Sequence, residues 1–231
     1  MSEQQNDRVI LQADTLVKTY GKGEEMIYAL DHVSFTVNRG EFVAVTGESG
    51  GGKTTLLNVL GTLDLPDSGR VIFDGTDLSG RSDDYLSTYR RRNIGFIFQH
   101  YNLIPVLTVE ENIVLPLNLD NTPCDKAYLD ELLELVGLTA KRKHYPHELS
   151  GGQQQRVAFA RALIHKPALV LADEPTGNLD SKNSREIISV LKNSIAKYNQ
   201  TLILITHDGN IAAQADRVFK MHDGVMTEVG V

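Results

Sequence analysis

The segment at residues 47–54 constrains the fold of this chain more than any other feature of its sequence. It reads Gly-Glu-Ser-Gly-Gly-Gly-Lys-Thr and fits the phosphate-loop pattern G-x-x-x-x-G-K-[ST]. An apolar run at 41–46 precedes it and is typical of a buried strand, and the run at 54–60 has helical spacing. A glycine-rich turn without a ligand is the alternative, but a strand, glycines and a helix in this order favour a phosphate-binding loop.

The residue types of this loop suit phosphate chemistry. Glycines allow backbone N–H groups to turn toward phosphate oxygens, and the start of the following helix carries a partial positive charge. Lys53 is expected to reach the β- and γ-phosphates of a nucleotide, and the Thr54 hydroxyl to ligate Mg²⁺. The side chain of Glu48 is expected to point away from the phosphates, because both are negatively charged. The predicted nucleotide contacts of the loop are Gly47, Glu48, Ser49, Gly50, Gly51, Gly52, Lys53, Thr54 and Thr55.

Composition narrows the classes of protein to which the chain can belong. Its 231 residues, 41% of them hydrophobic, suffice for one domain with an inserted subdomain. A net charge of −7 argues against sequence-independent nucleic-acid binding. The single cysteine, Cys124, excludes an intramolecular disulfide and fits a reducing cytoplasm. The polar N-terminus is unlike a signal peptide, and no apolar run approaches the length of a membrane span, so we expect a soluble protein.

The order of the expected elements indicates an α/β fold. From Gln99 to about residue 165 the sequence is mostly helical, and elsewhere apolar strands alternate with helices. This order predicts a largely parallel sheet interrupted by a helical insertion. The arginines at 90–92 are interpreted as part of a solvated face. The expected strands lie within 9–20, 27–46, 70–73, 94–98, 168–172, 202–205, 217–221 and 225–229.

A second candidate anion site lies at the start of a later helix. Ser150, Gly151, Gly152 and Gln153 offer exposed N–H groups, a hydroxyl and the positive end of a helix. An ordinary helix cap explains the serine and glycines equally well, so these residues alone leave both interpretations open.

Two carboxylates follow an apolar strand soon afterwards. Asp173, at the end of the strand, is placed to hold Mg²⁺ directly or through water, and Glu174 can accept a proton from an attacking water. A pair of surface acids is the alternative, although surface acids seldom follow so apolar a strand directly. His207 also lies just beyond a predicted strand, at residues 202–206.

The sequence resembles an ATP-binding cassette (ABC) ATPase, because the signatures of that family follow one another in order across residues 9–229. They are the phosphate loop at 47–54, the Q-loop residue Gln99, the signature at 149–153, the Walker B segment at 169–174, the D-loop at 178–180 and the switch residue His207. A kinase or a GTPase would leave the signature segment unexplained.

The resemblance implies the fold and the chemistry. It implies one ABC ATPase domain over residues 1–231, with an N-terminal antiparallel β subdomain, a phosphate-loop NTPase core at about 8–98 and 166–231, and an inserted helical subdomain at about 99–165. It implies hydrolysis of ATP with Mg²⁺. The implied catalytic residues are Glu174, His207, Gln99 and Lys53, the metal ligands are Thr54, Gln99 and Asp173, and the ATP contacts beyond the loop are Tyr20, Ser150, Gly151, Gly152, Gln153 and Asp180.

Within these roles, Glu174 polarises water, Gln99 couples Mg²⁺ to the helical subdomain and His207 contacts the γ-phosphate. An aromatic residue stacks on adenine upstream of the loop. Tyr20 matches that position best and Tyr28 is the rival, although either could be a core residue.

The wording of the motifs is similar to the branch of macrolide exporters, lipoprotein-releasing systems, antimicrobial-peptide resistance transporters and FtsE-type ATPases. This implies a bacterial transport ATPase that works as a head-to-tail homodimer at the inner face of the cell membrane, with a permease on a separate chain. An FtsE-like ATPase that controls a membrane partner without transporting a solute is the alternative. Soluble ABC proteins of DNA repair or translation are disfavoured, since the chain has neither a long coiled-coil insertion nor a second cassette.

The segment from Gln99 to Asn112 is expected to receive a short helix of the permease, because the Q-loop lies at the root of the helical subdomain in this family. Tyr101, Leu103 and Leu107 are candidates for exposed apolar contacts, with burial inside the subdomain as the alternative.

Overall fold

The computed structural model describes residues 8–177 and 181–230, which form two compact units. The first unit comprises Met1–Ser87 and Thr201–Val231, and the second comprises Thr88–Gln200. The subdomain boundaries expected near residues 98 and 166 stay a prediction. The D-loop residues 178–180 lie outside the described residues.

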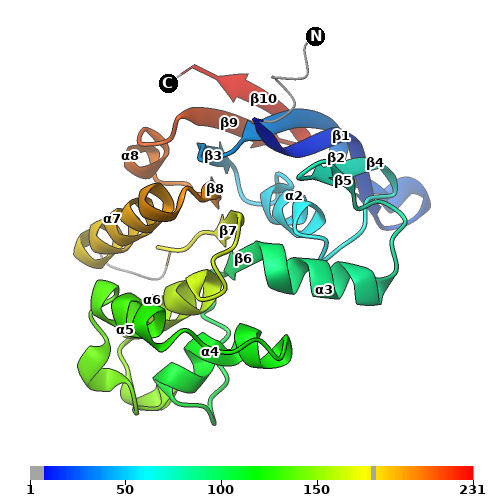
Figure 1. Ribbon diagram of the computed structural model, residues 1–231. Helices are drawn as coiled ribbons and strands as arrows, with labels where there is room; N and C mark the ends of the chain where they lie inside the picture. Colours follow the sequence, from blue (N-terminus) through cyan, green and yellow to red (C-terminus); the bar gives the residue numbers. More distant parts are fainter. Residues whose placement is uncertain (1–7, 178–180, 231) are drawn as a thin grey trace. The chain divides into compact units, whose positions relative to one another are not determined.

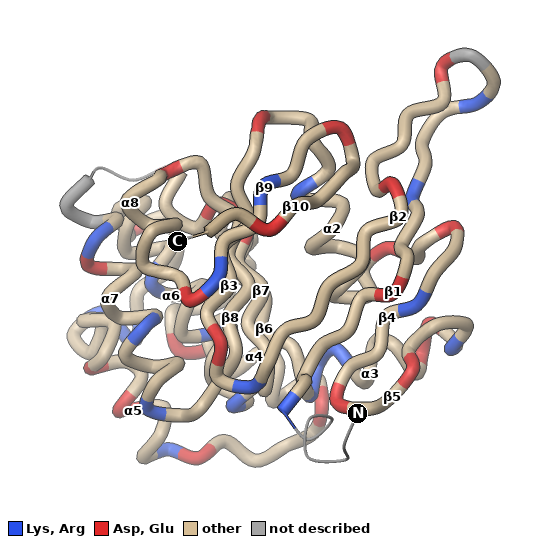
Figure 2. Tube along the Cα trace, turned by 90° about the horizontal axis from the view of Figure 1, so that it is seen from above, with Lys and Arg blue, Asp and Glu red and all other residues tan. Residues whose placement is uncertain are grey.

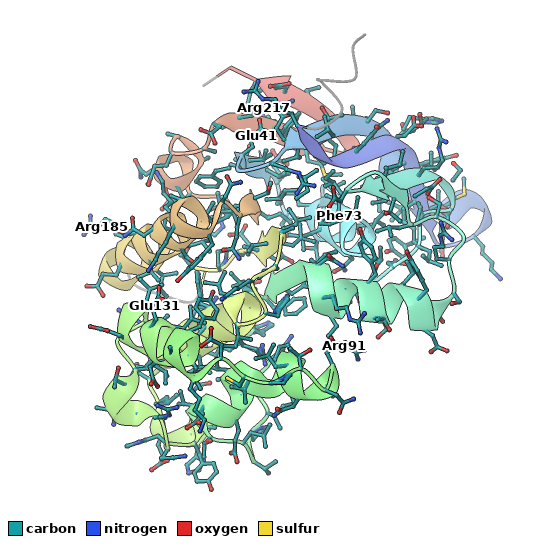
Figure 3. All side chains as sticks on the ribbon, viewed as in Figure 1. Glu41, Phe73, Arg91, Glu131, Arg185 and Arg217 are labelled. Atoms are coloured by element: carbon teal, nitrogen blue, oxygen red, sulfur yellow. The ribbon has the colours of Figure 1, made fainter. Side chains whose placement is uncertain are left out.

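The first unit contains an antiparallel sheet built from the early strands (Figure 1). Its strands run in the order β2-β1-β4-β5, and Phe73 of β4, labelled in Figure 3, is fully buried beneath them. The connection between β1 and β2 projects beyond the rest of this sheet (Figure 2), and places Tyr20 and Tyr28 on its two arms. The strands are β1 (Val9–Tyr20), β2 (Ile27–Asn38), β4 (Ser68–Phe73) and β5 (Thr76–Asp77), with a 3₁₀ turn η1 (Gly23–Glu25).

The same unit carries the parallel strands that position the phosphate loop. Strand β3 (Phe42–Gly47) pairs in parallel with β8 (Thr201–Ile205) on one side and with β9 (Arg217–His222) on the other. β10 (Val225–Val229) then pairs antiparallel with β9. The central residues of β3 are fully buried, which explains why residues 42–45 are uniformly apolar.

Two helices of this unit follow parallel strands. The helix α2 (Lys53–Leu60) follows β3 and ends at Gly61, as the sequence predicted, and α8 (Gly209–Ala212) follows β8. At the opposite end of β3, Arg217 and Glu41 lie beside each other (Figure 3) with 3.4 Å between their charged groups. Arg217 also pairs with Glu228 at 2.7 Å, so one side chain joins β9 to β10 and to the start of β3.

The second unit is mainly helical, around a pair of parallel strands. β6 (Ile94–Ile97) pairs in parallel with β7 (Leu169–Asp173). The predicted cap and stripe of one helix are confirmed, since the Asp125 side chain accepts from the Tyr128 amide and the apolar residues of that helix are buried. The helices are α4 (Val109–Leu119), α5 (Lys126–Leu135), α6 (Gly151–Leu163) and α7 (Ser181–Tyr198), with 3₁₀ turns η2 (Thr139–Lys141) and η3 (Pro146–Glu148).

The basic run near residue 90 belongs to a helix that the apolar pattern does not reveal. α3 (Asp83–Asn93) begins in the first unit and ends in the second, and Leu86 is its only buried residue within the described part of the chain. Its last turn carries Arg91, which is half-buried, and Arg92, which is exposed; both donate to the carboxylate of Asp120. These two arginines are therefore paired as well as solvated.

His165, just after α6, is expected to make folding stability sensitive to acid. Burial lowers the pKa of its imidazole to about 4, below the ordinary value of 6.5. Protonation therefore favours the unfolded chain, so this contribution is complete above pH 6.5 and is lost as the pH falls toward 4. From pH 7 to pH 5 the loss should be about 2 kcal/mol. Unfolding of the wild type and of His165→Gln, measured at both pH values, should show a smaller acid effect in the variant; an equal effect would contradict this assignment.

Candidate functional site

The phosphate loop lies between β3 and α2, in the context that the motif requires. Gly47 and Gly52 adopt positive φ angles of 141° and 98°. A Cβ atom at Gly47 would lie 2.0 Å from the carbonyl oxygen of Met221, and one at Gly52 would lie 2.0 Å from that of Ala29. Only glycine fits at these two positions, because any side chain would collide with backbone on β9 or β2.

Lys53 is folded back over this loop. Its Nζ atom donates to the carbonyl oxygens of Gly47, at 2.9 Å, and Glu48, at 2.6 Å, and the residue is only 9% exposed. The loop thus holds a buried ammonium group at its centre, where it can exchange a carbonyl for a phosphate oxygen. Thr54, next on α2, is exposed, and Thr55 is half-buried.

The variable positions of the loop differ in their exposure. Glu48 and Ser49 are exposed. Gly51 is buried, and a Cβ atom there would lie 3.2 Å from the carbonyl oxygens of both Glu48 and Met221. A residue larger than glycine at Gly51 would therefore require these carbonyls to move by a few tenths of an ångström.

The switch residue lies at the same edge of the sheet as the loop. Val45 of β3 pairs with Ile205 of β8 in a parallel register, and the amide of Thr206 donates to the carbonyl of Val45. Parallel strands present their carboxyl ends together, so the exposed His207 follows β8 where Gly47 ends β3. The first unit therefore brings Lys53 and His207 to one edge.

Both candidate adenine platforms are exposed. Tyr20 is 46% exposed and Tyr28 is 44% exposed, so neither is a core residue. Tyr20 has a side-chain partner that holds its ring, because its hydroxyl donates to the Asp64 carboxylate at 2.7 Å. Burial of the Tyr20 hydroxyl and its bond to Asp64 raise the pKa of the phenol. Tyr20 is therefore held in a fixed direction at the end of β1.

The signature segment forms the start of α6 in the second unit. Ser150 caps the helix, since its hydroxyl accepts from the Gln153 amide while the Gln153 side chain accepts from the amide of Ser150. Ser150 and Gly151 are exposed, and Gly152 and Gln153 are half-buried. The helix-cap interpretation is thus confirmed, and it leaves the exposed helix start available to an anion. A Cβ atom at Gly151 would lie 2.8 Å from the Tyr101 hydroxyl.

The carboxylates and the Q-loop residue meet in the second unit. Ile97 of β6 pairs in parallel with Ala172 of β7, so the exposed Gln99 and the residues Asp173 and Glu174 lie at one strand edge. Glu174 has a left-handed φ of 44°, a conformation that non-glycine residues rarely adopt and that concentrates at functional sites. The amide of Gly177 donates to the Glu174 carbonyl at 3.0 Å, which fixes this turn.

The described residues contain no cluster of three or more histidine, cysteine, aspartate or glutamate side chains able to hold a metal. Within the second unit, the carboxylate of Asp173 and the side-chain amide of Gln99 fit the preference of Mg²⁺ for oxygen donors. Asp180 cannot be placed, because it lies outside the described residues. Sequence reasoning did not identify Asp64, since nothing in its local sequence indicates a contact with Tyr20.

Comparison with known proteins places this chain in a family. A family model described as ABC transporter matches residues 30–177. The ABC transporter ATP-binding protein MJ1508 of Methanocaldococcus jannaschii is 45% identical over 95% of this chain and 99% of its own length. The lipoprotein-releasing system ATP-binding protein LolD of Bordetella avium is 45% identical over 93% of this chain and 94% of its own length. The macrolide export ATP-binding/permease protein MacB of Chlorobaculum tepidum is 46% identical over 92% of this chain and 33% of its own length.

Solved structures agree with the sequence matches. The ATP-binding cassette MJ0796, in a dimeric post-hydrolysis state with ADP and Pi, has a TM-score of 0.87 and 40% identity over 96% of this chain and 100% of its own length. A second dimeric structure of MJ0796 has a TM-score of 0.86. The predicted fold class, with its antiparallel β subdomain, is confirmed. No helix among the described residues is long and apolar enough to cross a membrane. The chain therefore belongs to the ATP-binding proteins of ABC transporters, within their LolD/MacB-type branch, and these proteins are ATP-hydrolysing cassettes.

Proposed function

We propose that this chain drives a membrane permease, carried on a separate polypeptide, by binding Mg-ATP between two copies of itself and hydrolysing it. The observation that supports this most strongly is the pairing of a complete phosphate loop with an exposed signature helix start in one chain. The dimeric cassette with ADP and Pi, at 40% identity, supports the same arrangement. LolD-type relatives are named as the ATP-binding proteins of a lipoprotein-releasing system, which supports a permease on a separate chain, and we propose a location at the inner membrane face.

Each candidate residue has a role in this proposal. Lys53 binds the β- and γ-phosphates, exchanging its bonds to loop carbonyls for bonds to phosphate oxygens. His207 contacts the γ-phosphate from the end of β8. Thr54, Asp173 and Gln99 are the proposed ligands of Mg²⁺, which when bound would offset the charge that develops on the transferred phosphoryl group. Glu174 accepts a proton from the attacking water as that water adds to phosphorus and ADP departs.

Replacing the proposed adenine platform should weaken ATP binding. Tyr20→Ala should weaken it by about 5- to 150-fold, because stacking of an aromatic side chain on a base is worth about 1–3 kcal/mol. Tyr28→Ala, which removes an aromatic residue of similar exposure, serves as the matched control and should have a smaller effect. Calorimetric titration with ATP measures both. Equal affinities of the two variants would remove Tyr20 from its proposed role.

The loop after Gln99 presents two apolar side chains to solvent. The expected candidates Tyr101, Leu103 and Leu107 are all half-buried, so neither alternative for them holds in full. Ile104 and Val106 are instead the exposed apolar residues, at 40% and 79%. Sequence reasoning missed this pair, since hydrophobicity alone cannot distinguish it from its half-buried neighbours.

Two polar side chains of the second unit, one buried and one half-buried, hold this loop. Asn112, which is fully buried, accepts from the Ile104 amide at 2.8 Å and donates to the carbonyls of Ile104, Leu107 and Thr108. Arg161 of α6 donates to the carbonyls of Tyr101 and Asn102. Because the loop is already fixed, a partner that binds the exposed pair Ile104 and Val106 would lose little conformational entropy in ordering it.

Cross-linking from this loop tests the proposed permease contact. In a Cys124→Ser background, Val106→Cys should cross-link to an integral membrane protein in native membranes, because Val106 is the most exposed apolar residue of the loop. Val225→Cys on β10, 46% exposed, is the control and should give no such product. Identification of the product by mass spectrometry gives the partner. A partner that cross-links from position 225 and not from 106 would contradict the assignment. Transport assays with that partner then separate transport from FtsE-like control.

A further inference from the structure

Tyr20 is tied to the segment that follows the helix of the phosphate loop. Its hydroxyl donates to Oδ2 of Asp64 at 2.7 Å, across 44 residues of sequence. The other carboxylate oxygen of Asp64 accepts from the Leu65 amide at 2.8 Å and from Nζ of Lys18 at 2.8 Å. Both oxygens of Asp64 are thus engaged, and one of them holds the phenol.

Lys18 completes this arrangement two residues before the tyrosine on β1. Its side chain is 13% exposed, its Nζ atom also donates to the Leu65 carbonyl at 2.8 Å, and it lies 5.4 Å from the centre of the Tyr20 ring. Burial opposes ionisation of Asp64, but hydrogen bonds from Lys18 and Tyr20 outweigh it and hold the pKa of the carboxyl below its usual value. Asp64 is therefore charged at neutral pH.

The segment that carries Asp64 continues directly from the phosphate loop. Lys53 opens α2, and the amides of Leu63 and Asp64 donate to the carbonyl of Asn58 on that helix at 2.8 and 3.2 Å. A few residues later, Asp67 accepts from the amide and hydroxyl of Thr19. The last residues of β1, from Lys18 to Tyr20, are therefore fastened to the segment that follows the helix of the phosphate loop.

We propose that Asp64 is a positioning residue that fixes the Tyr20 ring relative to the phosphate loop, and so sets how much a purine base adds to the binding of its triphosphate. Without this bond the half-exposed ring regains rotational freedom, and the nucleotide must restrict it again on binding. The inference rests on the proposed role of Tyr20 as the adenine platform. It extends that role to a residue with no chemistry of its own toward the nucleotide.

The test compares a ligand that has a base with one that lacks it. Asp64→Ala should weaken ATP about tenfold and leave inorganic tripolyphosphate unchanged, measured by its competition against ATP. Tyr20→Phe, which removes only the hydroxyl, should give a similar loss. The double variant should lose no more than either single one, because both break the same bond. In steady-state hydrolysis the KM for ATP should rise while kcat stays constant.

Asp14→Ala is the matched control. Asp14 lies on β1, the strand of Tyr20, and its ion pair with Arg70 of β4 spans 2.6 Å. The variant removes this pair without altering the tyrosine or its bond to Asp64, and should leave ATP affinity unchanged. Additive losses in the double variant, or equal losses for ATP and tripolyphosphate from Asp64→Ala, would overturn the inference. If Asp64→Ala does not fold, Tyr20→Phe with unaltered ATP affinity would overturn it equally. If Tyr20→Ala leaves ATP affinity unchanged, the proposed role of Tyr20 as the adenine platform is wrong. The failure of that role is thus distinguishable from the failure of the inference about Asp64.

Discussion

Glu174→Gln should abolish ATP turnover and retain ATP binding. Glutamine has the shape of glutamate but cannot take the proton of the attacking water, whereas the phosphate contacts come from other residues. General-base catalysis contributes about 10²–10⁴-fold to such reactions, so kcat should fall by at least the lower figure. Since Glu174 lies in a tight turn with φ of 44°, a substitution of equal shape also leaves this backbone conformation undisturbed.

Lys53→Ala should differ by losing binding and turnover together, because it removes a buried charge from the centre of the phosphate loop. Glu228→Gln is the matched control for Glu174→Gln: it neutralises a carboxylate on β10 that pairs with Arg217 and has no proposed contact with the nucleotide. ATP affinity by calorimetry and phosphate release at steady state decide the outcome. Near-normal hydrolysis by the Glu174 variant would exclude it as the base.

The sequence predicted the elements whose patterns are local. Strand β3, the glycine turn and α2 follow from an apolar run, a motif and a helix stop, and α5 from the cap at Asp125. Helix α3 escaped prediction because Leu86 is the only residue it is known to bury, so it has no apolar stripe. Its acidic first turn and basic last turn, which suit the helix dipole, were the available signal.

The parts of the site that the sequence could not predict depend on contacts between distant residues. The bond between Tyr20 and Asp64 joins a strand end to a loop 44 residues later, and no local pattern marks it. Asn112 ends the segment that the sequence assigned to partner contact, but only the structure shows that its side-chain amide is fully buried and bonded to the loop before it. Residue types in the sequence indicated the chemistry of the site, whereas the residues that hold the site residues in place were found only from the structure.

If each ATP is bound by the phosphate loop of one chain and the signature segment of another, as we propose, two variants that are inactive alone should restore one ATP site when mixed. The phosphate loop opens α2 in the first unit, and Ser150 opens α6 in the second, so each chain carries two anion-binding helix starts and one pair of carboxylates. In our proposal the two starts share one nucleotide only across a head-to-tail pair of chains. ATP then favours the dimer, because it contacts both chains in that state alone. A site contained within one chain would not have this property.

Lys53→Ala breaks the loop and keeps the signature, and Gly151→Asp breaks the signature, by adding a carboxylate where the phosphates would bind, and keeps the loop. Each alone should occlude no ATP. In a mixed dimer the intact loop of the second variant meets the intact signature of the first, so one complete site forms and occluded ATP should reappear. Labelled ATP retained through rapid gel filtration, with a different tag on each variant to isolate mixed dimers, measures this. A mixture of differently tagged Lys53→Ala chains is the control. Isolated mixed dimers that retain no ATP would show that the two starts do not share a nucleotide, because nothing else would be missing from that site.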